Sequence, residues 1–236
     1  MLHRYDWSES SLILELFTRT HGRVAVVAKG AKRPYSQLRA VLLPFQRLQV
    51  SWGQRKGETA EIQTLRSAEW QGGGLMLGGG AMLSGFYLNE LLIKLLVRQD
   101  PHPALFEAYA YTLPLLAAED PGVVQAALRG FELVLLRELG VLPALDRVTL
   151  TQQPLAAGRR YELASEAGLQ ASEDGLPPAA WQDLEQALGL GEMAPLHRAC
   201  AAALSGLKGQ LRGLLHYHLG HQRLRTRQLL MELPRA

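Results

Sequence analysis

Basic residues gather in the N-terminal third of the chain, at places where strands are expected to end. The segment AKGAKR puts Lys29, Lys32 and Arg33 just past one strand, and Gly30 allows an unusual backbone turn among them. Other cations of this region include Arg23, Arg39, Arg47, Arg55, Lys56 and Arg66. Cations at strand ends and in loops can converge on one groove of a small barrel and follow a phosphate backbone. The pattern indicates a nucleic-acid-binding surface, although solvation of exposed faces would also account for it.

Aromatic residues are interleaved with these cations. Trp7 and Tyr35 stand in polar surroundings, so we expect them to stack on bases, which makes binding tolerant of sequence. Phe45 and Trp52 are better explained as core or barrel-lid residues.

A second basic segment lies near the C-terminus, where Arg223, Arg225 and Arg227 alternate with Leu224 and Thr226. It is either a second phosphate-contacting patch or a solvated tail. Charge is also uneven along the chain. Residues 1–80 hold 11 Lys and Arg against 6 Asp and Glu, residues 81–197 hold 7 against 15, and residues 198–236 hold 7 against 1. Basic ends around an acidic middle suggest a polyanionic partner for the ends.

The residues that could support catalysis or metal binding are few. His216, His218 and His221 could form half of a metal site, because His218 and His221 share a face on a helix. No third ligand stands at the right spacing, so polar residues on an exposed helix end are the favoured interpretation. The sequence contains no phosphate-binding loop, no CxxC pair and no nucleophile elbow. We therefore expect no enzyme, no metal and no other cofactor.

Two features bear on location. Cys200 is the single cysteine, which fits a reducing cytosol. The longest apolar stretch, 81–97, contains Asn89, Glu90 and Lys94 and is too short and too polar to cross a bilayer comfortably. No signal peptide is visible. These observations predict a cytoplasmic protein without a membrane partner.

The patterning changes from strand to helix near residue 80. Strands are expected at 11–18, 23–28, 48–52 and 58–65, with a hairpin turn at 53–57 and a short helix or loop at 36–43. Two triple-glycine runs, 72–74 and 78–80, predict a domain boundary. Helices are expected at about 83–94, 103–117, 121–139, 181–188, 195–219 and 226–233. Residues 141–178 look irregular, apart from a short strand at 161–163. The prediction is an α+β chain, with a β-sandwich or small β-barrel domain over 1–80 and a helical domain over 81–236.

Several segments together resemble the RecO family of bacterial DNA repair and recombination mediators. They are WSESSLILELFT (7–18), HGRVAVVAKGAKR (21–33), LLPFQRLQVSW (42–52), TLRSAEW (64–70), FYLNELLIKLL (86–96), ALRGFELVLLRELG (127–140) and HLGHQRLRTRQLL (218–230). Each motif alone is weak, and the ordered set is specific. The resemblance implies an N-terminal OB-fold β-barrel followed by a helical C-terminal domain.

The resemblance also implies a function in DNA damage repair, at the nucleoid. RecO-like proteins bind single- and double-stranded DNA, anneal complementary strands, and work with RecR and the single-stranded DNA-binding protein SSB. They help load RecA onto SSB-coated strands. Many family members carry a four-cysteine zinc motif after the helix that ends in Leu-Gly. Residues 148–168 contain no cysteine, so zinc is not expected, and the segment 148–175 should hold its shape by packing alone.

The family also binds the acidic, Phe-ended tail of SSB in its helical domain. Arg129 matches a basic position of the family and could pair with the terminal carboxylate. Leu128, Phe131 and Leu135 could line the pocket for the phenyl ring, with ordinary core packing as the alternative, above all for Phe131.

Two other functions stay open at this stage. The chain could be an adaptor that binds SSB or RecR without touching DNA. It could also be a metal-dependent enzyme that uses His216, His218 and His221.

Overall fold

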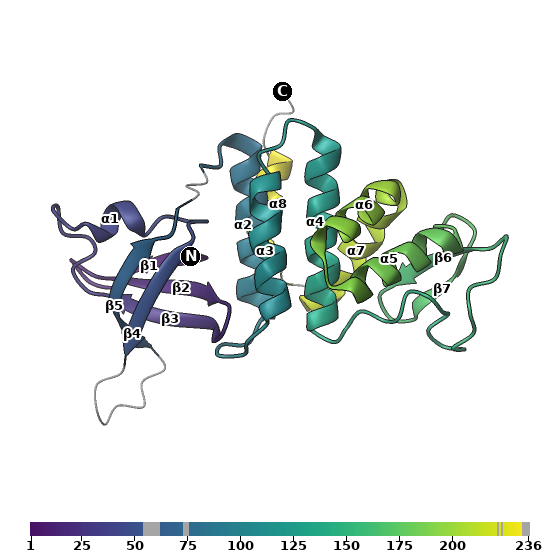
Figure 1. The fold of residues 1–236 in the computed structure, drawn as a ribbon, viewed down its shortest axis with the longest axis horizontal. Helices are drawn as coiled ribbons and strands as arrows, with labels where there is room; N and C mark the ends of the chain where they lie inside the picture. The colour runs from purple at the N-terminus through teal and green to yellow at the C-terminus, as the bar shows by residue number, and fades with distance from the viewer. Residues whose placement is uncertain (54–61, 73–75, 221, 223, 233–236) are drawn as a thin grey trace. The chain divides into compact units, whose positions relative to one another are not determined.

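The computed structural model describes residues 1–53, 62–72, 76–220, 222 and 224–232, with the backbone alone for 227 and 230–232. The chain divides into two compact units, Met1–Phe106 and Glu107–Ala236. A five-stranded sheet lies in the first unit, and most of the described residues after it are helical (Figure 1). The expected α+β class is confirmed.

The sheet is formed by β1 (His3–Asp6), β2 (Leu12–Thr18), β3 (Gly22–Ala28), β4 (Leu48–Gly53) and β5 (Gln63–Trp70), in the order β1-β2-β3-β5-β4. All recorded pairs are antiparallel except β3 with β5. This order, with one parallel pair, is that of the five-stranded Greek-key OB-fold. The short helix α1 (Leu38–Val41) lies between β3 and β4.

Period-two alternation explains why one face of this sheet forms the core. On β2 and β3, Leu12, Leu14, Leu16, Val24 and Val26 point inward and are buried. Residues of the opposite parity are also covered: Glu15, Phe17 and Ala25 are buried, and Ile13 and Val27 are half-buried.

Two strands differ from their expected places. No strand was expected at β1, because its four residues are all exposed and give no alternation of apolar side chains. The fourth strand was expected at 58–65, and β5 instead runs from Gln63 to Trp70. Its register on β4 shifts between Ser51 and Trp52, so that Arg66 has no partner on β4. This bulge breaks the alternation from which a strand is recognised.

The helix α2 (Gly79–Leu95) belongs to the same unit as the sheet. Asn89 donates its side-chain amide to the Leu2 carbonyl at 2.8 Å. The rings of Phe45 and Phe86 lie 5.1 Å apart, and a Cβ on Gly85 would meet Phe45 at 2.8 Å. The boundary expected after residue 80 therefore falls inside this compact unit.

The helices of the second unit are α3 (Pro103–Leu115, which begins in the first unit), α4 (Pro121–Glu138), α5 (Pro178–Leu190), α6 (Met193–Ala202), α7 (Leu204–His218) and α8 (Arg225–Glu232). The Asp-Pro start predicted for α4 is confirmed, because Asp120 accepts a hydrogen bond from the Gly122 N–H at 2.7 Å. α4 packs against α6 and α7.

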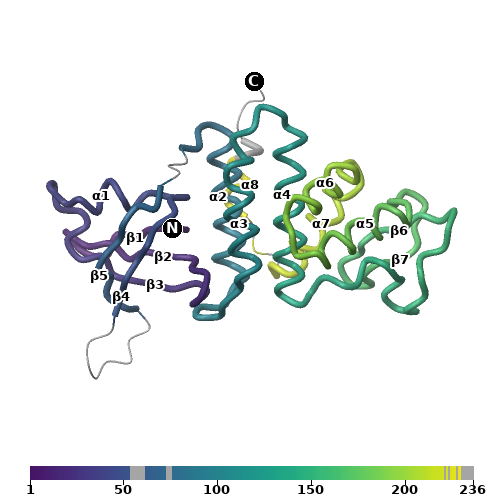
Figure 2. Tube along the Cα trace, viewed as in Figure 1, coloured from purple at the N-terminus to yellow at the C-terminus, as the bar shows by residue number. Residues whose placement is uncertain are grey.

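Two sequence expectations for this unit need correction. The helix expected over 195–219 is two helices, α6 and α7, joined at Ala203 (Figure 2). No proline or glycine marks that break in the sequence. The irregular segment 141–178 contains a full hairpin, β6 (Arg160–Ala164) with β7 (Gly168–Ser172).

Candidate nucleic-acid interface

Arg23 lies at the start of β3 and has partners inside the sheet unit. Its guanidinium hydrogen-bonds the Ile93 carbonyl and lies 4.0 Å from the Glu15 carboxylate, and its side chain is 13% exposed. Burial is the main cause that lowers the pKa of Arg23, and Glu15 opposes this effect. A phosphate has little access to a side chain held in this way, so Arg23 is better explained as a structural residue.

Glu15 has a second arginine beside it. Arg98, just after α2, forms an ion pair with the same carboxylate, and its side chain is 40% exposed. Two cations against one buried carboxylate leave this cluster with a net positive charge.

The AKGAKR turn is ordered by its own backbone. Gly30 has φ of 71°, and the Arg33 N–H donates to its carbonyl at 3.1 Å. Lys32 braces the turn against the β1–β2 loop, because its ammonium lies 3.2 Å from Asp6 and 3.0 Å from the Ser8 carbonyl. The exposed cations of the turn are therefore Lys29 and Arg33, while Lys32 links two loops.

Tyr35 and Arg39 extend this region toward α1. Tyr35 is 99% exposed and Arg39 is exposed on α1. Trp7 is 63% exposed, whereas Phe45 is buried and Trp52 is half-buried. The sequence-based division of these aromatic residues into exposed and packed groups is confirmed.

Arg66 lies elsewhere on the sheet, at the β5 bulge. Its guanidinium lies over Gly53, where a Cβ would come within 2.3 Å of it. Ser51 and Ser67, whose hydroxyls are 2.6 Å apart, continue the exposed face beside it. The bulge turns Arg66 toward solvent, where it can meet a phosphate.

Two exposed residues of β1, His3 and Tyr5, were not identified from the sequence as candidate site residues. His3 and Tyr5 have the same parity as Trp7, and the first two rings lie 4.5 Å apart. Tyr5 is 43% exposed. The signal was an aromatic residue at every second position of HRYDW, which is detectable only once this segment is known to be a strand.

Of the expected DNA-binding residues, three are not described by the structure and a fourth is described by its backbone alone. Arg55, Lys56 and Arg223 lie outside the described residues, as does His221 of the histidine group, and the side chain of Arg227 is not described. Arg225 is exposed at the start of α8 and takes part in a further polar or ring contact.

The residues expected to bind the SSB tail are inside the helical unit. Phe131 and Leu135 are fully buried, and Leu128 is 5% exposed. Arg129 is 6% exposed and pairs with Glu132 on the same helix at 2.6 Å. A docking peptide needs an accessible pocket and cation, so the structure argues against a tail site at these four residues. The spacing of these four residues along the helix is explained by their place on the buried face of α4.

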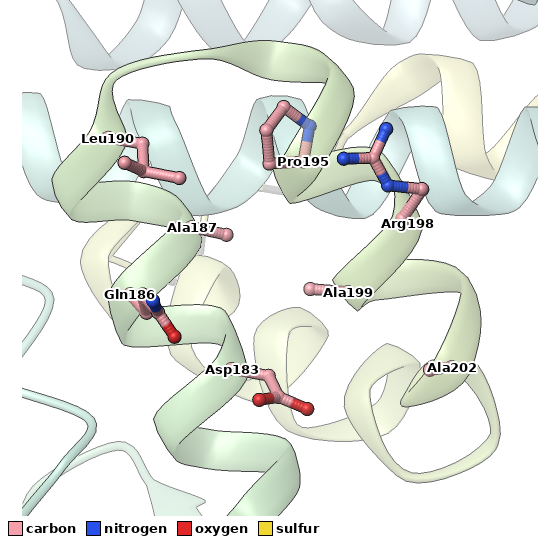
Figure 3. Close-up of a pocket in the computed structure, with 8 residues that line it drawn as sticks. All are labelled: Asp183, Gln186, Ala187, Leu190, Pro195, Arg198, Ala199 and Ala202. Atoms are coloured by element: carbon pink, nitrogen blue, oxygen red, sulfur yellow. The ribbon is translucent and has the colours of Figure 1, made fainter.

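An open groove does occur between α5 and α6, with a volume of about 320 Å³ (Figure 3). Ala187, Pro195 and Ala199 are among its apolar lining residues, with Arg198 on one side and Asp183 on the other.

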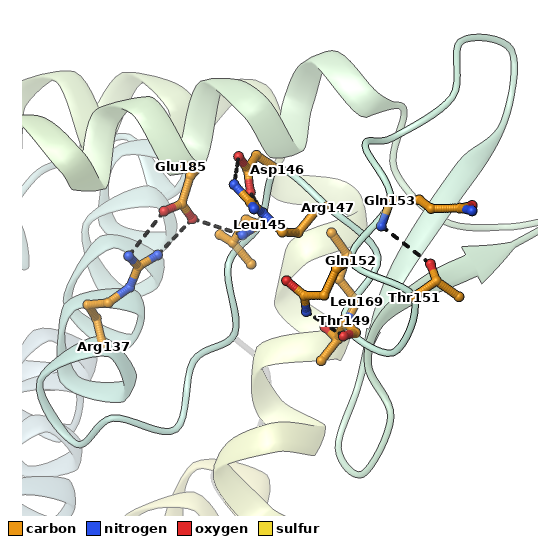
Figure 4. Close-up of polar contacts among 10 residues, drawn as sticks. All are labelled: Arg137, Leu145, Asp146, Arg147, Thr149, Thr151, Gln152, Gln153, Leu169 and Glu185. Carbon is orange, nitrogen blue, oxygen red and sulfur yellow. Dashed lines mark hydrogen bonds and ion pairs between the residues drawn. The ribbon is translucent and has the colours of Figure 1, made fainter.

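The segment 148–175 and the residues just before it are held by polar contacts as well as packing. Arg137 on α4 makes two hydrogen bonds to the Glu185 carboxylate on α5, at 3.1 and 2.7 Å, and Glu185 also accepts the Leu145 N–H at 2.9 Å (Figure 4). Further on, the Trp181 indole donates to the Tyr161 carbonyl at 3.0 Å. The expectation that packing alone holds this segment was wrong.

The exposed side of α7 is basic. Its buried leucines, such as Leu207 and Leu211, define the inner face, and the Gln210 side-chain oxygen accepts a hydrogen bond from the Leu163 N–H at 2.6 Å. Lys208 and Arg212, one turn apart, are exposed and have no acidic partner among the described residues. Lys208 and Arg212 were not identified from the sequence as candidate DNA-binding residues.

The described residues contain no group of three His, Cys, Asp or Glu side chains placed to hold a metal ion. Cys200 is buried, and burial is the main cause that raises its pKa to about 12. Among the helices that the structure describes, none is long and apolar enough to cross a membrane.

The fold defines a class, namely an α+β protein with an N-terminal five-stranded sheet and a mostly helical C-terminal region. Residues 1–73 match the family described as "Recombination protein O N terminal", and residues 79–228 match "Recombination protein O C terminal". The chain belongs to the RecO family. This membership agrees with the prediction that the protein is not an enzyme.

Individual relatives support the same assignment over the full chain. The DNA repair protein RecO of Polaromonas naphthalenivorans is 56% identical over 238 residues, which cover 99% of this chain and 94% of that protein. The DNA repair protein RecO of Variovorax paradoxus is 53% identical over 248 residues, with the same coverage.

Proposed function

We propose that this protein is a recombination mediator that binds single- and double-stranded DNA and anneals complementary strands in the cytoplasm, at the nucleoid. With RecR, it would help load RecA onto DNA coated by SSB. The observation that carries the proposal is the exposed basic and aromatic surface of the sheet unit, on a chain of the RecO family.

The sheet unit supplies the first DNA-binding surface. Lys29, Arg33, Tyr35, Arg39 and Arg66 are its exposed members, with Lys32 as a brace that keeps two loops together. Arg23 is left out because its partners are internal. Cations that replace condensed counterions give affinity without sequence preference, which suits a mediator that acts on any strand.

Annealing needs two strands on one protein, and the helical unit offers a second surface. Lys208 and Arg212 on α7 are exposed cations in the C-terminal region, where basic residues dominate. Each unit would hold one strand by its phosphates, and the strands would complete the base pairing themselves.

A salt titration of single-strand binding tests this function. The wild-type protein should show affinity that falls steeply with salt, and Lys29→Ala/Arg33→Ala/Arg66→Ala should lower the slope by up to ~2. Arg159→Ala is a matched control, because Arg159 is exposed on the β6–β7 side of the helical unit. A flat salt response of the wild-type protein would refute direct DNA binding.

A second function, adaptor binding of an acidic peptide such as the SSB tail, is favoured by the α5–α6 groove. Its apolar lining could hold a phenyl ring, and Arg198 could pair with a carboxylate. Binding of an acidic, Phe-ended peptide should weaken in Arg198→Glu and stay unchanged in Arg159→Glu. Equal binding by both variants would exclude this groove.

A further inference from the structure

The aromatic residues His3 and Tyr5 of β1 and Trp7, which follows the strand, form one row, called the β1 row. His3, Tyr5 and Trp7 share a parity, because His3 pairs with Glu15, Tyr5 pairs with Ile13, and the Trp7 N–H donates to the Ser11 carbonyl at 3.2 Å. β1 has one recorded partner, β2, so the row runs along an edge of the described sheet order. Tyr5 and Trp7 are 43% and 63% exposed, a large apolar area to leave in water.

The ring of His3 supports that of Tyr5. Their centroids are 4.5 Å apart and their planes cross at 69°, so the edge of one ring meets the face of the other. A base cannot enter between two rings in such contact. Tyr5 and Trp7 are therefore the two rings that offer a face to a ligand, and His3 is a positioning residue.

The spacing of the row selects the form of nucleic acid. Residues two apart on a strand are separated by about 6.7 Å. Bases stacked in one strand of a duplex rise by only about 3.4 Å each. Successive bases of a DNA strand can reach Tyr5 and Trp7 only if that DNA strand is extended and its bases no longer stack on one another. In a duplex, both faces of each base are already covered by neighbouring bases.

The charges around the row suit a phosphate backbone. Lys29 is exposed and follows directly after β3, whose Ala28 pairs with Leu12. At the other end, Arg98, whose side chain is 40% exposed, pairs with Glu15, the partner of His3. Asp6 points to the opposite side and pairs with Lys32.

We infer that the β1 row is a stacking site for the unstacked bases of an extended single strand, with Tyr5 and Trp7 each holding one base. The inference rests on the proposed DNA binding and deepens it. The cations would attract any DNA, and the row would favour the single-stranded form. It also gives a reason for exposed aromatic residues on an edge strand, where an unpaired backbone is usually protected by charges.

The test compares the full-length proteins Tyr5→Ala, Trp7→Ala and, as a matched control, Trp70→Ala. Trp70 is 54% exposed but lies at the end of β5 and bonds Gln46 through its indole. Affinity is measured over a range of salt for a mixed-sequence single strand, the same strand with abasic sites, and a duplex.

Each row variant should lose about tenfold or more of its affinity for the single strand, with an unchanged salt slope, because stacking releases no counterions. Affinity for the abasic strand and the duplex should stay within about twofold of the wild type. Tyr5→Phe and Trp7→Phe keep a ring and should restore single-strand binding, which also excludes a folding defect.

Two results would overturn the inference. One is wild-type affinity for the single strand in both alanine variants. The other is an equal loss on single strand, abasic strand and duplex. Absence of salt-dependent DNA binding in the wild-type protein would instead refute the proposed function, so the two failures are distinguishable.

Discussion

Arg129 and Glu132 form an ion pair across one turn of α4, with 2.6 Å between the Arg129 Nη2 and the Glu132 Oε1. The Arg129 side chain is 7% exposed and that of Glu132 is fully buried. Two charges withdrawn from water are stable only as a pair. Glu132 also helps burial to raise the pKa of the nearby Cys200 thiol. Arg129 therefore has a structural task that accounts for its presence without any partner protein.

Arg129→Ala should destabilise the protein by about 3–5 kcal/mol, because it leaves the Glu132 carboxylate buried without its partner. Urea unfolding measures this loss. The double variant Arg129→Met/Glu132→Leu removes both charges at similar volume and should recover most of the stability. If Arg129→Ala unfolds like the wild type but loses affinity for an acidic tail peptide, the expected partner role of Arg129 would be restored.

Glu185→Gln should cost about 1–2 kcal/mol, because the amide cannot replace both charged hydrogen bonds to Arg137 and the bond to the Leu145 N–H. The partial exposure of this pair keeps the value low. Asp146→Asn, which breaks the more exposed contact to Arg147, is the control and should change stability by less than about 0.5 kcal/mol.

A metal chelator should leave the thermal unfolding of the wild-type protein unchanged, because the described residues contain no group of three potential metal ligands and residues 148–168 contain no cysteine. A clear drop of the midpoint on chelation would contradict this view of the segment after α4.

The fragment 1–106 should fold, and the fragment 1–80 should be less stable by several kcal/mol. Without α2 and the turn after it, Glu15 loses Arg98, the Leu2 carbonyl loses Asn89, and Phe45 loses Phe86. Circular dichroism during urea unfolding compares the two. Equal stability would show that the sheet is independent of α2 and that the domain ends at the glycine runs.

Lys208→Glu/Arg212→Glu should slow annealing of complementary oligonucleotides and lower the salt slope of duplex binding by about 2, because two phosphate contacts are lost. Both residues are exposed, so folding should be unaffected. Arg159→Glu is the control, because Arg159 is exposed. Lys94 would not serve as a control, because it forms an ion pair with Glu90 that the substitution would break. Annealing at the wild-type rate would remove α7 from the second surface.

Sequence reasoning succeeded where local patterning was strong. Strands β2 and β3, predicted from an apolar and a β-branched run, and the Asp-Pro cap of α4 were predicted close to their observed places. It failed at β1 and at the Arg66 bulge of β5, because pairing with neighbouring strands shapes these segments and their own side chains do not alternate. The site residues divided in the same way. Exposure of Trp7 and Tyr35 followed from polar neighbours, whereas the burial of Arg129 could not be read from a basic residue on an amphipathic helix.

By itself, the sequence determined the α+β class, the basic N-terminal region and the family resemblance, because composition, periodicity and ordered motifs are properties of the chain alone. Only the tertiary structure decided which cations are available. Arg23 and Arg129 face buried carboxylates, Lys32 bridges two loops, and Lys29 and Arg33 remain in solvent. It also showed the β1 aromatic row. The physical reason is that the availability of a side chain depends on neighbours brought close by the fold from distant parts of the chain.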